Sequence, residues 1–238
     1  MRKVFLHIVW FMVLLFLFTA CKEKNDYHYP SVSLGFITVK GGEDGHLQLL
    51  IPDNGELMSI LKDRTNTKIS PNTFKRLLSN YEATLVDGKS AAIIYSLQEL
   101  LTPEPKLPND PAYAEGIKTD PVTMVSIWMG RNYLNMILSL KVKGGKKHVI
   151  GMVEESIVHE GTEKVVTLSL FHDAAEDEPY YDRRAYVSVP LQKYKLDWPG
   201  QTLRIKFKYH TYGEDGKVIE SDRYCRPGFE YIPNVTDK

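Results

Sequence analysis

The feature that most limits the fold of this chain is a strict alternation of apolar and other residues. Over Tyr133–Lys143, apolar side chains recur at every second position: Leu134, Met136, Leu138, Leu140 and Val142. Residues with this spacing share one face of a strand, and a shift of one residue would turn the intervening lysines toward the core. Similar short runs with Gly-rich turns between them predict an antiparallel β-sandwich over residues 122–238. We expect its seven strands at Met124–Met129, Tyr133–Lys143, His148–Val153, Val165–Phe171, Ala185–Leu191, Thr202–Tyr212 and Lys217–Tyr224.

Residues 32–100 also have the pattern of a small β domain. Asp53-Asn54-Gly55 and Asp87-Gly88 are hairpin signals, because such residues tolerate the backbone angles of tight turns. Ser70-Pro71 could begin a helix, and Phe74, Leu77 and Leu78 follow at helical spacing, so we expect one short helix over Pro71–Asn80. Several strands with one small helix predict an OB-like barrel. The expected fold class is therefore all-β.

Residues 101–121 interrupt both patterns. Five prolines occur here, and the stretch has no hydrophobic period. This composition favours extended or turn conformations, so we interpret it as a Pro-rich linker between the two domains.

The N-terminus has the layout of an export signal. Arg2 and Lys3 precede the apolar run Val4–Phe18, and Thr19-Ala20 are the small residues before Cys21. The apolar run is shorter than the ~20 residues of a spanning helix. The segment resembles the lipobox of bacterial lipoproteins, which implies removal of residues 1–20 and acylation of Cys21 with diacylglycerol and palmitate. Residues 21–31 would then form a lipidated tether to the outer membrane, with surface exposure as the alternative.

Charge and cysteine content exclude several functions. The leader removes Arg2 and Lys3, which leaves 28 basic and 30 acidic side chains, and this balance does not favour nucleic acid as a partner. After lipidation of Cys21, only Cys225 remains, so no internal disulfide is expected. A structural cysteine is the simpler interpretation of Cys225, although Arg223 and Arg226 lie near it in the sequence.

The second half of the chain resembles a known family. Asp120–Trp128, Tyr133-Leu134-Asn135, Lys146-Lys147-His148 and Leu168–His172 carry a resemblance to NigD-like lipoproteins. In that family, a lipidated cysteine precedes an OB-type domain and a β-sandwich. The resemblance implies an exported lipoprotein of Gram-negative bacteria, named after a bacteriocin-associated locus, and it supplies no catalytic residues.

Two groups of side chains are candidate ligand-binding residues. Tyr180 and Tyr181 lie in a predicted loop beside Pro179, where exposed aromatic rings can stack on sugars or peptides. Arg204, Lys206 and Lys208 form a basic stripe that could bind phosphates or acidic glycans. The solvent-facing side of an amphipathic strand is the plainer interpretation of the stripe.

No motif predicts a metal site, a cofactor or a reaction. The six histidines outside the leader lack HExxH spacing and are expected at the surface or at an interface. The acidic stretch Asp173–Asp182 could hold calcium, but it lacks the spacing of an EF-hand, so a solvated loop is the alternative. We therefore expect a non-enzymatic envelope lipoprotein with a recognition or interaction role toward envelope proteins or polysaccharide. The alternatives are a glycan or small-ligand binding module and a bacteriocin-associated accessory or immunity factor.

Overall fold

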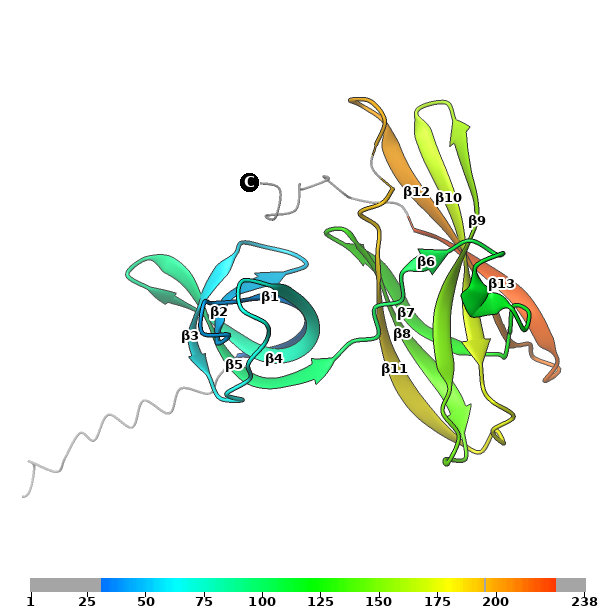
Figure 1. Cartoon of the computed structure of the whole chain (residues 1–238), viewed down its shortest axis with the longest axis horizontal. Helices are drawn as coiled ribbons and strands as arrows, with labels where there is room; N and C mark the ends of the chain where they lie inside the picture. The colour runs from blue at the N-terminus through cyan, green and yellow to red at the C-terminus, as the bar shows by residue number, and fades with distance from the viewer. Residues whose placement is uncertain (1–30, 195, 226–238) are drawn as a thin grey trace, which may run out of the picture. The chain divides into compact units, whose positions relative to one another are not determined.

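The computed structural model describes residues 31–194 and 196–225, and these residues are almost entirely β-structure (Figure 1). The predicted leader, Cys21 and nearly all of the tether lie outside the described residues. Within the described residues, no helix is long and apolar enough to cross a membrane. The only helix described is one 3₁₀ turn, η1 (Pro111–Tyr113).

Residues 32–99 form a closed five-stranded barrel with the strand order β1-β2-β3-β5-β4. Its strands are β1 (Val32–Gly41), β2 (Leu47–Pro52), β3 (Met58–Asp63), β4 (Phe74–Val86) and β5 (Lys89–Glu99). β3 and β5 pair in parallel, whereas the other pairs are antiparallel. The interior is filled by aliphatic side chains that include Ile37, Leu50 and Ile94. A barrel is therefore present, while its classification as an OB fold remains a prediction.

The predicted helix over Pro71–Asn80 is wrong, because β4 occupies most of this range. Leu77 lies in the barrel core and Leu78 lies in a second cluster outside it, so both faces of the strand are covered. A strand that is buried on both faces has apolar residues at successive positions. Such a run cannot be distinguished by its spacing from the apolar positions of a helix. Ser70-Pro71-Asn72-Thr73 form a turn instead of a cap: Thr73 N–H donates to the Ser70 carbonyl, and Asn72 has a φ of 56°.

The predicted β-sandwich is confirmed, and it consists of a three-stranded and a five-stranded sheet whose strands lie within residues 105–225, where a sandwich over residues 122–238 was expected (Figure 1). The first sheet has the order β11-β8-β7, and the second has the order β13-β12-β10-β9-β6. The strands are β6 (Pro105–Lys106), β7 (Thr123–Gly130), β8 (Tyr133–Val142), β9 (Val149–Glu160), β10 (Glu163–Asp173), β11 (Tyr181–Pro190), β12 (Thr202–Tyr212) and β13 (Val218–Cys225). The five alternating apolar side chains of β8 are all buried between the sheets, as the sequence predicts.

The sandwich is not purely antiparallel, which corrects the predicted topology. β10 and β12 pair in parallel, from Glu163 opposite Thr202 to Ser169 opposite Lys208. The chain crosses to the other sheet for β11 between them, so it returns in the same direction as β10. The short strand β6 also pairs in parallel, with β9.

The predicted linker connects barrel and sandwich, but much of it packs against the sandwich. β6 lies within it, and Tyr113 is buried against Phe171 with 5.0 Å between the ring centroids. The Tyr113 hydroxyl donates to the Met152 carbonyl over 2.9 Å. At the ends of the segment, Leu101 bridges to β11 and Thr119 bridges to β10. These contacts make residues 101–121 part of the sandwich surface, and the residues from Val32 onward group into one compact unit.

Candidate functional site

Barrel and sandwich are joined by a buried polar cluster around Arg76, which we call the junction network: Asp53, Arg76, Asn135 and Ser188. The Arg76 guanidinium donates to Asp53 Oδ2 over 2.6 Å, to Asn135 Oδ1 over 3.1 Å and to Ser188 Oγ over 3.0 Å. Only 4% of the Arg76 side chain and 8% of the Asp53 side chain is exposed. Buried charges persist in proteins when they are paired and hydrogen-bonded in this way.

Further contacts between the barrel and the first half of β8, with the turn that precedes it, strengthen the junction. Asn135 Nδ2 donates to Asp53 Oδ2 over 2.7 Å, and the Arg76 guanidinium lies 4.3 Å from the centroid of the Tyr133 ring. Arg131 donates to the carbonyls of Pro52 and Gly55 over 2.6 and 2.9 Å. The turn between β2 and β3 is therefore tied to the first strands of the sandwich.

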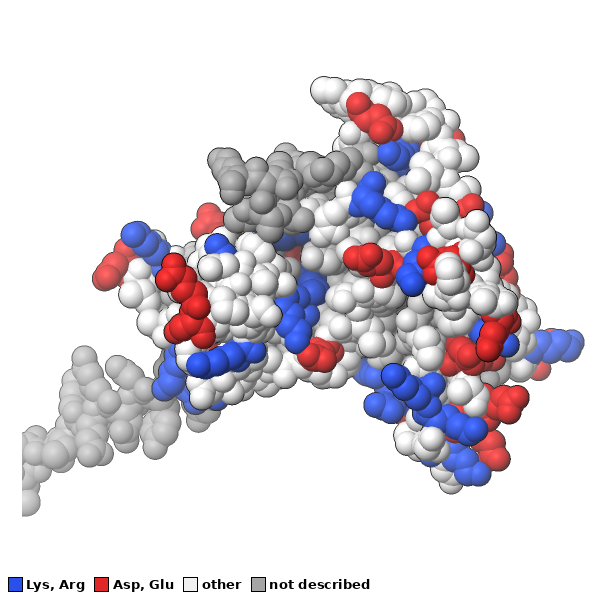
Figure 2. All heavy atoms as spheres, in the orientation of Figure 1, with Lys and Arg blue, Asp and Glu red and all other residues white. Residues whose placement is uncertain are grey.

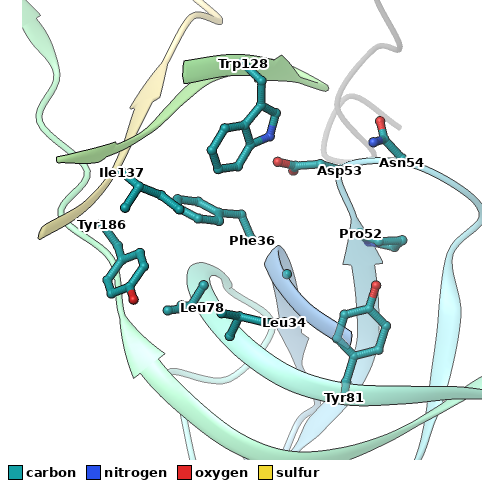
Figure 3. Close-up of a pocket in the computed structure, with 11 residues that line it drawn as sticks. Leu34, Phe36, Pro52, Asp53, Asn54, Leu78, Tyr81, Trp128, Ile137 and Tyr186 are labelled. Carbon is teal, nitrogen blue, oxygen red and sulfur yellow. The ribbon is translucent and has the colours of Figure 1, made fainter. Parts of the chain in front are cut away.

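Beside the junction network lies a pocket of about 270 Å³, which we call the junction pocket (Figure 3). Phe36 and Trp128 meet edge to face on one side, with 4.9 Å between their centroids and an angle of 84°. Figure 3 shows the indole nitrogen of Trp128 on the side of the ring turned toward Asp53. The other lining residues are Leu34, Gly35, Pro52, Asn54, Leu78, Tyr81, Ile137 and Tyr186.

The junction pocket combines apolar rings with a few polar groups at its edge. Burial and the negative charge of Asp53 raise the pKa of Tyr81, so its hydroxyl stays protonated. Aromatic walls with a small number of placed polar groups are typical of small-molecule sites, and the volume lies just below their usual ~300–1,000 Å³. The pocket could therefore hold a single small ring.

A pair of histidines forms a second polar cluster, at the loop end of β9 and β10. His148 Nδ1 and His172 Nε2 lie 3.0 Å apart, and His172 Nδ1 lies 3.0 Å from the Asp120 carbonyl. His148 Nε2 lies 3.3 Å from Asp177 Oδ2. Burial lowers the pKa of His172, and the neighbouring His148 acts in the same direction, against the opposing effect of the Asp120 carbonyl. Both rings are therefore held within the fold. Of the two predicted positions for the histidines, surface or interface, the surface is wrong for His172, which is 2% exposed.

A larger pocket of about 430 Å³, which we call the cationic cleft, opens where the edges of β11 and β9 meet residues 98–101. Its apolar residues include Leu140, Val142, Ile150 and Ala185. Four cationic side chains line it: Lys146, Lys147, Arg183 and Arg184. One carboxylate, Glu99, also lines it and is paired with Lys75. In the view of Figure 2, blue Lys and Arg atoms gather toward the lower end of the sandwich, with red carboxylates among them.

The four cations of the cleft differ from their neighbours in having no carboxylate partner among the described residues. Lys141 pairs with Asp182 over 2.9 Å, and Lys143 pairs with Glu178 over 2.6 Å. The acidic residues nearest in sequence are thus already engaged. The cleft retains an excess of positive charge at its rim, and it is a candidate site for an acidic ligand.

The predicted basic stripe lies on β12, and its cations are matched by carboxylates. Arg204 pairs with Glu160 and Glu163, Lys206 with Asp222, and Lys208 with Glu155 and Glu220. Apolar residues on the opposite side of the strand, among them Ile205 and Phe207, are buried. The alternation of buried and polar side chains along β12 is thus as predicted. Binding of an anion by the stripe remains a prediction, and the ion pairs argue against it because they already neutralise the cations.

Tyr180 lies just before β11 and is 80% exposed. Tyr181 is the first residue of β11 and is 49% exposed. Their rings lie edge to face, with 6.4 Å between the centroids. The predicted exposure of the two rings is confirmed, whereas ligand binding by them remains a prediction. The structure does not bring them together with the basic stripe in either pocket.

The acidic loop makes specific hydrogen bonds within the protein. Asp177 Oδ2 accepts from the backbone of Lys143 and Gly144 over 3.0 and 3.2 Å. Burial alone would raise the pKa of Asp177, but these N–H groups and His148 outweigh it and lower the pKa. Among the described residues, no group of three or more His, Cys, Asp or Glu side chains is arranged to hold a metal ion.

Cys225 is buried at the end of β13, in the sandwich core. Burial raises the pKa of its thiol to about 11, so the thiol is protonated at neutral pH. This environment matches the structural cysteine expected from the sequence.

Sequence reasoning missed the junction network, the histidine pair and the cationic cleft. Asp53, Arg76 and Asn135 are far apart in the chain, and Asn135 stands at a position that the alternation assigns to the polar face. That face is covered by the barrel, which leaves Asn135 without solvent contact. The adjacent pairs Lys146-Lys147 and Arg183-Arg184 were the available signal for the cleft.

Comparisons with known proteins point to one family. The model of the NigD-like C-terminal beta sandwich domain matches residues 105–223. A NigD-like immunity protein from Bacteroides caccae is 57% identical, with 82% of this chain and 94% of that chain covered and a TM-score of 0.73. No curated protein matches this sequence.

Two more distant crystal structures share the fold. A candidate toxin-related protein from Parabacteroides distasonis is 21% identical, with 81% and 93% of the two chains covered and a TM-score of 0.62. A candidate lipoprotein from Bacteroides fragilis is 12% identical, with 86% and 100% covered and a TM-score of 0.61. The arrangement of barrel and sandwich is thus compatible with sequences that differ at most positions.

Proposed function

Because this chain belongs to the NigD-like family, we propose that it is a lipid-anchored protein of the cell envelope with a non-catalytic, immunity-type role. The observation that carries this proposal is the 57% identity to a NigD-like immunity protein, which extends over 94% of that protein's chain. The lipobox-like segment before Cys21 supports the anchor, because two or more acyl chains hold a protein stably to a bilayer.

The chemistry of the described residues supports a role in binding. The Cys225 thiol is buried and protonated, and the two central histidines are tied to each other and to Asp120 and Asp177. In contrast, both pockets present side chains suited to holding a ligand: aromatic rings in one and cations in the other. The proposed role would rest on contact with a toxin or its target, for which these surfaces are suited.

The proposal is tested with cells that lack the gene and cells complemented with the wild type or with Cys21→Ala. We expect at least one bacteriocin from related strains to inhibit the deletion cells and to be resisted by the complemented cells. The Cys21→Ala protein should lose palmitate labelling and membrane association, and protection should fall. Equal sensitivity of deletion and complemented cells across a broad panel would refute the immunity role, and normal acyl labelling of Cys21→Ala would refute the anchor.

The junction pocket favours a second candidate function, the binding of a small sugar. Trp128, Phe36 and Tyr186 supply aromatic surface, and Asp53 and Asn54 supply polar groups at the edge. Sugars are held in proteins by this combination of ring faces and hydrogen bonds. Titration with envelope monosaccharides should change the fluorescence of a Trp10→Phe/Trp198→Phe variant, which retains only Trp128. An unchanged signal across the panel would exclude this function.

A further inference from the structure

β11 is the edge strand of the three-stranded sheet, and one side of it is largely unpaired within the part of the chain that the structure describes. It pairs with β8 along its whole length, from Tyr181 opposite Val142 to Pro190 opposite Tyr133. On its other side, the described residues contribute a single bridge, at Leu101. Leu101 N–H donates to the Tyr186 carbonyl over 3.1 Å, and Ser188 N–H donates to the Leu101 carbonyl over 2.8 Å. The protein thus already uses this edge to receive an extended segment running parallel to it.

The pattern of these two bonds identifies which backbone groups remain available. The backbone groups of successive strand residues point alternately to the two neighbouring strands. Because Tyr186 and Ser188 face away from β8, so do Arg184 and Asp182. No strand or bridge of the described chain pairs with β11 on that side before Leu101. The first half of β11 therefore has a row of N–H and C=O groups without a strand partner among residues 31–194 and 196–225.

The free edge borders the cationic cleft, because Arg183, Arg184, Ala185 and Tyr186 of β11 line that cleft. Lys146 and Lys147 come from the opposite rim, just before β9. None of the four cations has a carboxylate partner among the described residues, whereas Lys141 and Lys143 beside them do. Apolar side chains such as Ile150 and Ala185 line the same cleft.

We propose that the free edge of β11 binds an extended acidic segment of a partner protein, which adds to the sheet as a fourth strand. Backbone hydrogen bonds to the edge would supply affinity, as in other strand-addition complexes. Successive side chains of such a segment point to opposite faces. Arg183 and Arg184 are successive residues of β11 and also point to opposite faces, so the carboxylates on one face of the segment would meet one of these cations, and the apolar residues on its other face would lie beside the other. The proposal does not depend on the immunity role, because any protein with such a segment would be recognised.

Charged side chains on edge strands also have a protective use, since they discourage pairing with other chains. If the cations serve only this protective role, neither an acidic nor a basic strand should bind. The proposal requires that the acidic strand binds and the basic strand does not. Binding of acidic and basic strands therefore distinguishes the two.

The probe is a fluorescein-labelled eight-residue peptide of alternating Glu and Val, titrated by anisotropy against the purified full-length protein in detergent. We expect saturable binding of this peptide and no binding of the alternating Lys and Val peptide. The double variant Lys146→Glu/Arg183→Glu should bind at least tenfold more weakly. The matched control Lys62→Glu/Lys89→Glu reverses two exposed barrel lysines and should bind like the wild type.

A second measurement uses only the wild-type protein and thus does not depend on the folding of a variant. The same Glu and Val peptide with N-methyl groups at alternate residues keeps its charges but loses the donors of one edge. We expect it to bind at least fivefold more weakly. Equal binding of the methylated peptide, equal loss in both double variants, or binding of polygalacturonate with no binding of the peptide would overturn strand addition.

Discussion

Arg76 is a charged side chain with almost no solvent contact, and its hydrogen-bond partners come from the barrel, from β8 and from β11. Asp53 carries the only negative charge in this junction network. Removing one partner of a buried ion pair leaves the other charge without compensation, which costs about 3–5 kcal/mol. The stability of the molecule therefore depends on a few polar atoms at the junction.

We expect Asp53→Ala to lower the free energy of unfolding by about 3–5 kcal/mol, because the guanidinium stays buried without its carboxylate. Urea unfolding followed by far-UV circular dichroism measures this loss. Glu99→Gln, which breaks the exposed pair with Lys75, is the control and should leave the unfolding midpoint unchanged within error. A loss for Asp53→Ala no larger than that of the control would show that the junction network is not a source of stability.

His172 should make stability fall as the solution becomes acidic. Its folded-state pKa is lowered below the ordinary 6.5, so the unfolded chain takes up a proton more readily than the folded protein does. The contribution of the neutral His172 ring to the free energy of unfolding is complete above pH ~6.5, and it is lost as the pH falls from there through the lowered pKa. The groups that face this ring are His148, Asp120 and Asp173. The urea midpoint should fall between pH 7 and pH 5, and it should fall less in His172→Gln; equal slopes would assign the effect to other groups.

At the scale of the secondary-structure elements, β7 and the turn after β2 approach each other closely at Gly130. A Cβ atom at this position would lie 2.4 Å from Asp53 Oδ2 and 2.6 Å from its Cγ. No L side chain is accommodated there unless Asp53 moves, so the approach of the two elements requires glycine. Gly130 thus couples the end of β7 to the junction network.

Gly130→Ala should destabilise the protein by about 1–3 kcal/mol, which is the usual range for overpacking a filled site. Because the clash is with the Asp53 side chain, the substitution should cost less in an Asp53→Ala background. Thermal unfolding of the two single variants and the double variant completes the cycle. Additive losses would mean that the added methyl group strains the backbone and does not act on Asp53.

The strands also differ in how accurately the sequence predicts them. β8 and β12 were predicted closely because one face of each meets the core and the other carries polar side chains. β4 was misassigned because Leu77 faces the barrel interior while Leu78 packs toward Trp128 and Ile137. A period of two is visible only when the two faces of a strand have different surroundings.

At the scale of the whole molecule, barrel and sandwich share one buried network and a common aromatic cluster. Phe36, Leu78 and Leu100 pack with Trp128, Ile137 and Tyr186, beside the junction pocket. Elements connected in this way tend to unfold together, because separation exposes both the apolar cluster and the buried charges.

We therefore expect a single cooperative transition in differential scanning calorimetry of the wild-type protein. Arg76→Ala should separate it into two transitions, one for the barrel and one for the sandwich, because it removes the hydrogen bonds that cross the junction. Lys62→Ala, an exposed barrel variant, serves as the control and should keep one transition. Two transitions in the wild type would show that the junction does not couple the parts.

The sequence by itself determined the all-β class, the approximate positions of strands β7 to β13 and the family, because a two-residue period and short matching segments are local properties. Only the tertiary structure decided that Asn135, on the polar side of its strand, is buried, and that Asp53, Arg76 and Ser188 meet around it. The same holds for the cationic cleft, where Lys146 from the connection before β9 and Arg183 of β11 line one pocket. Contacts between residues this far apart depend on how the layers pack, and no local pattern records that packing.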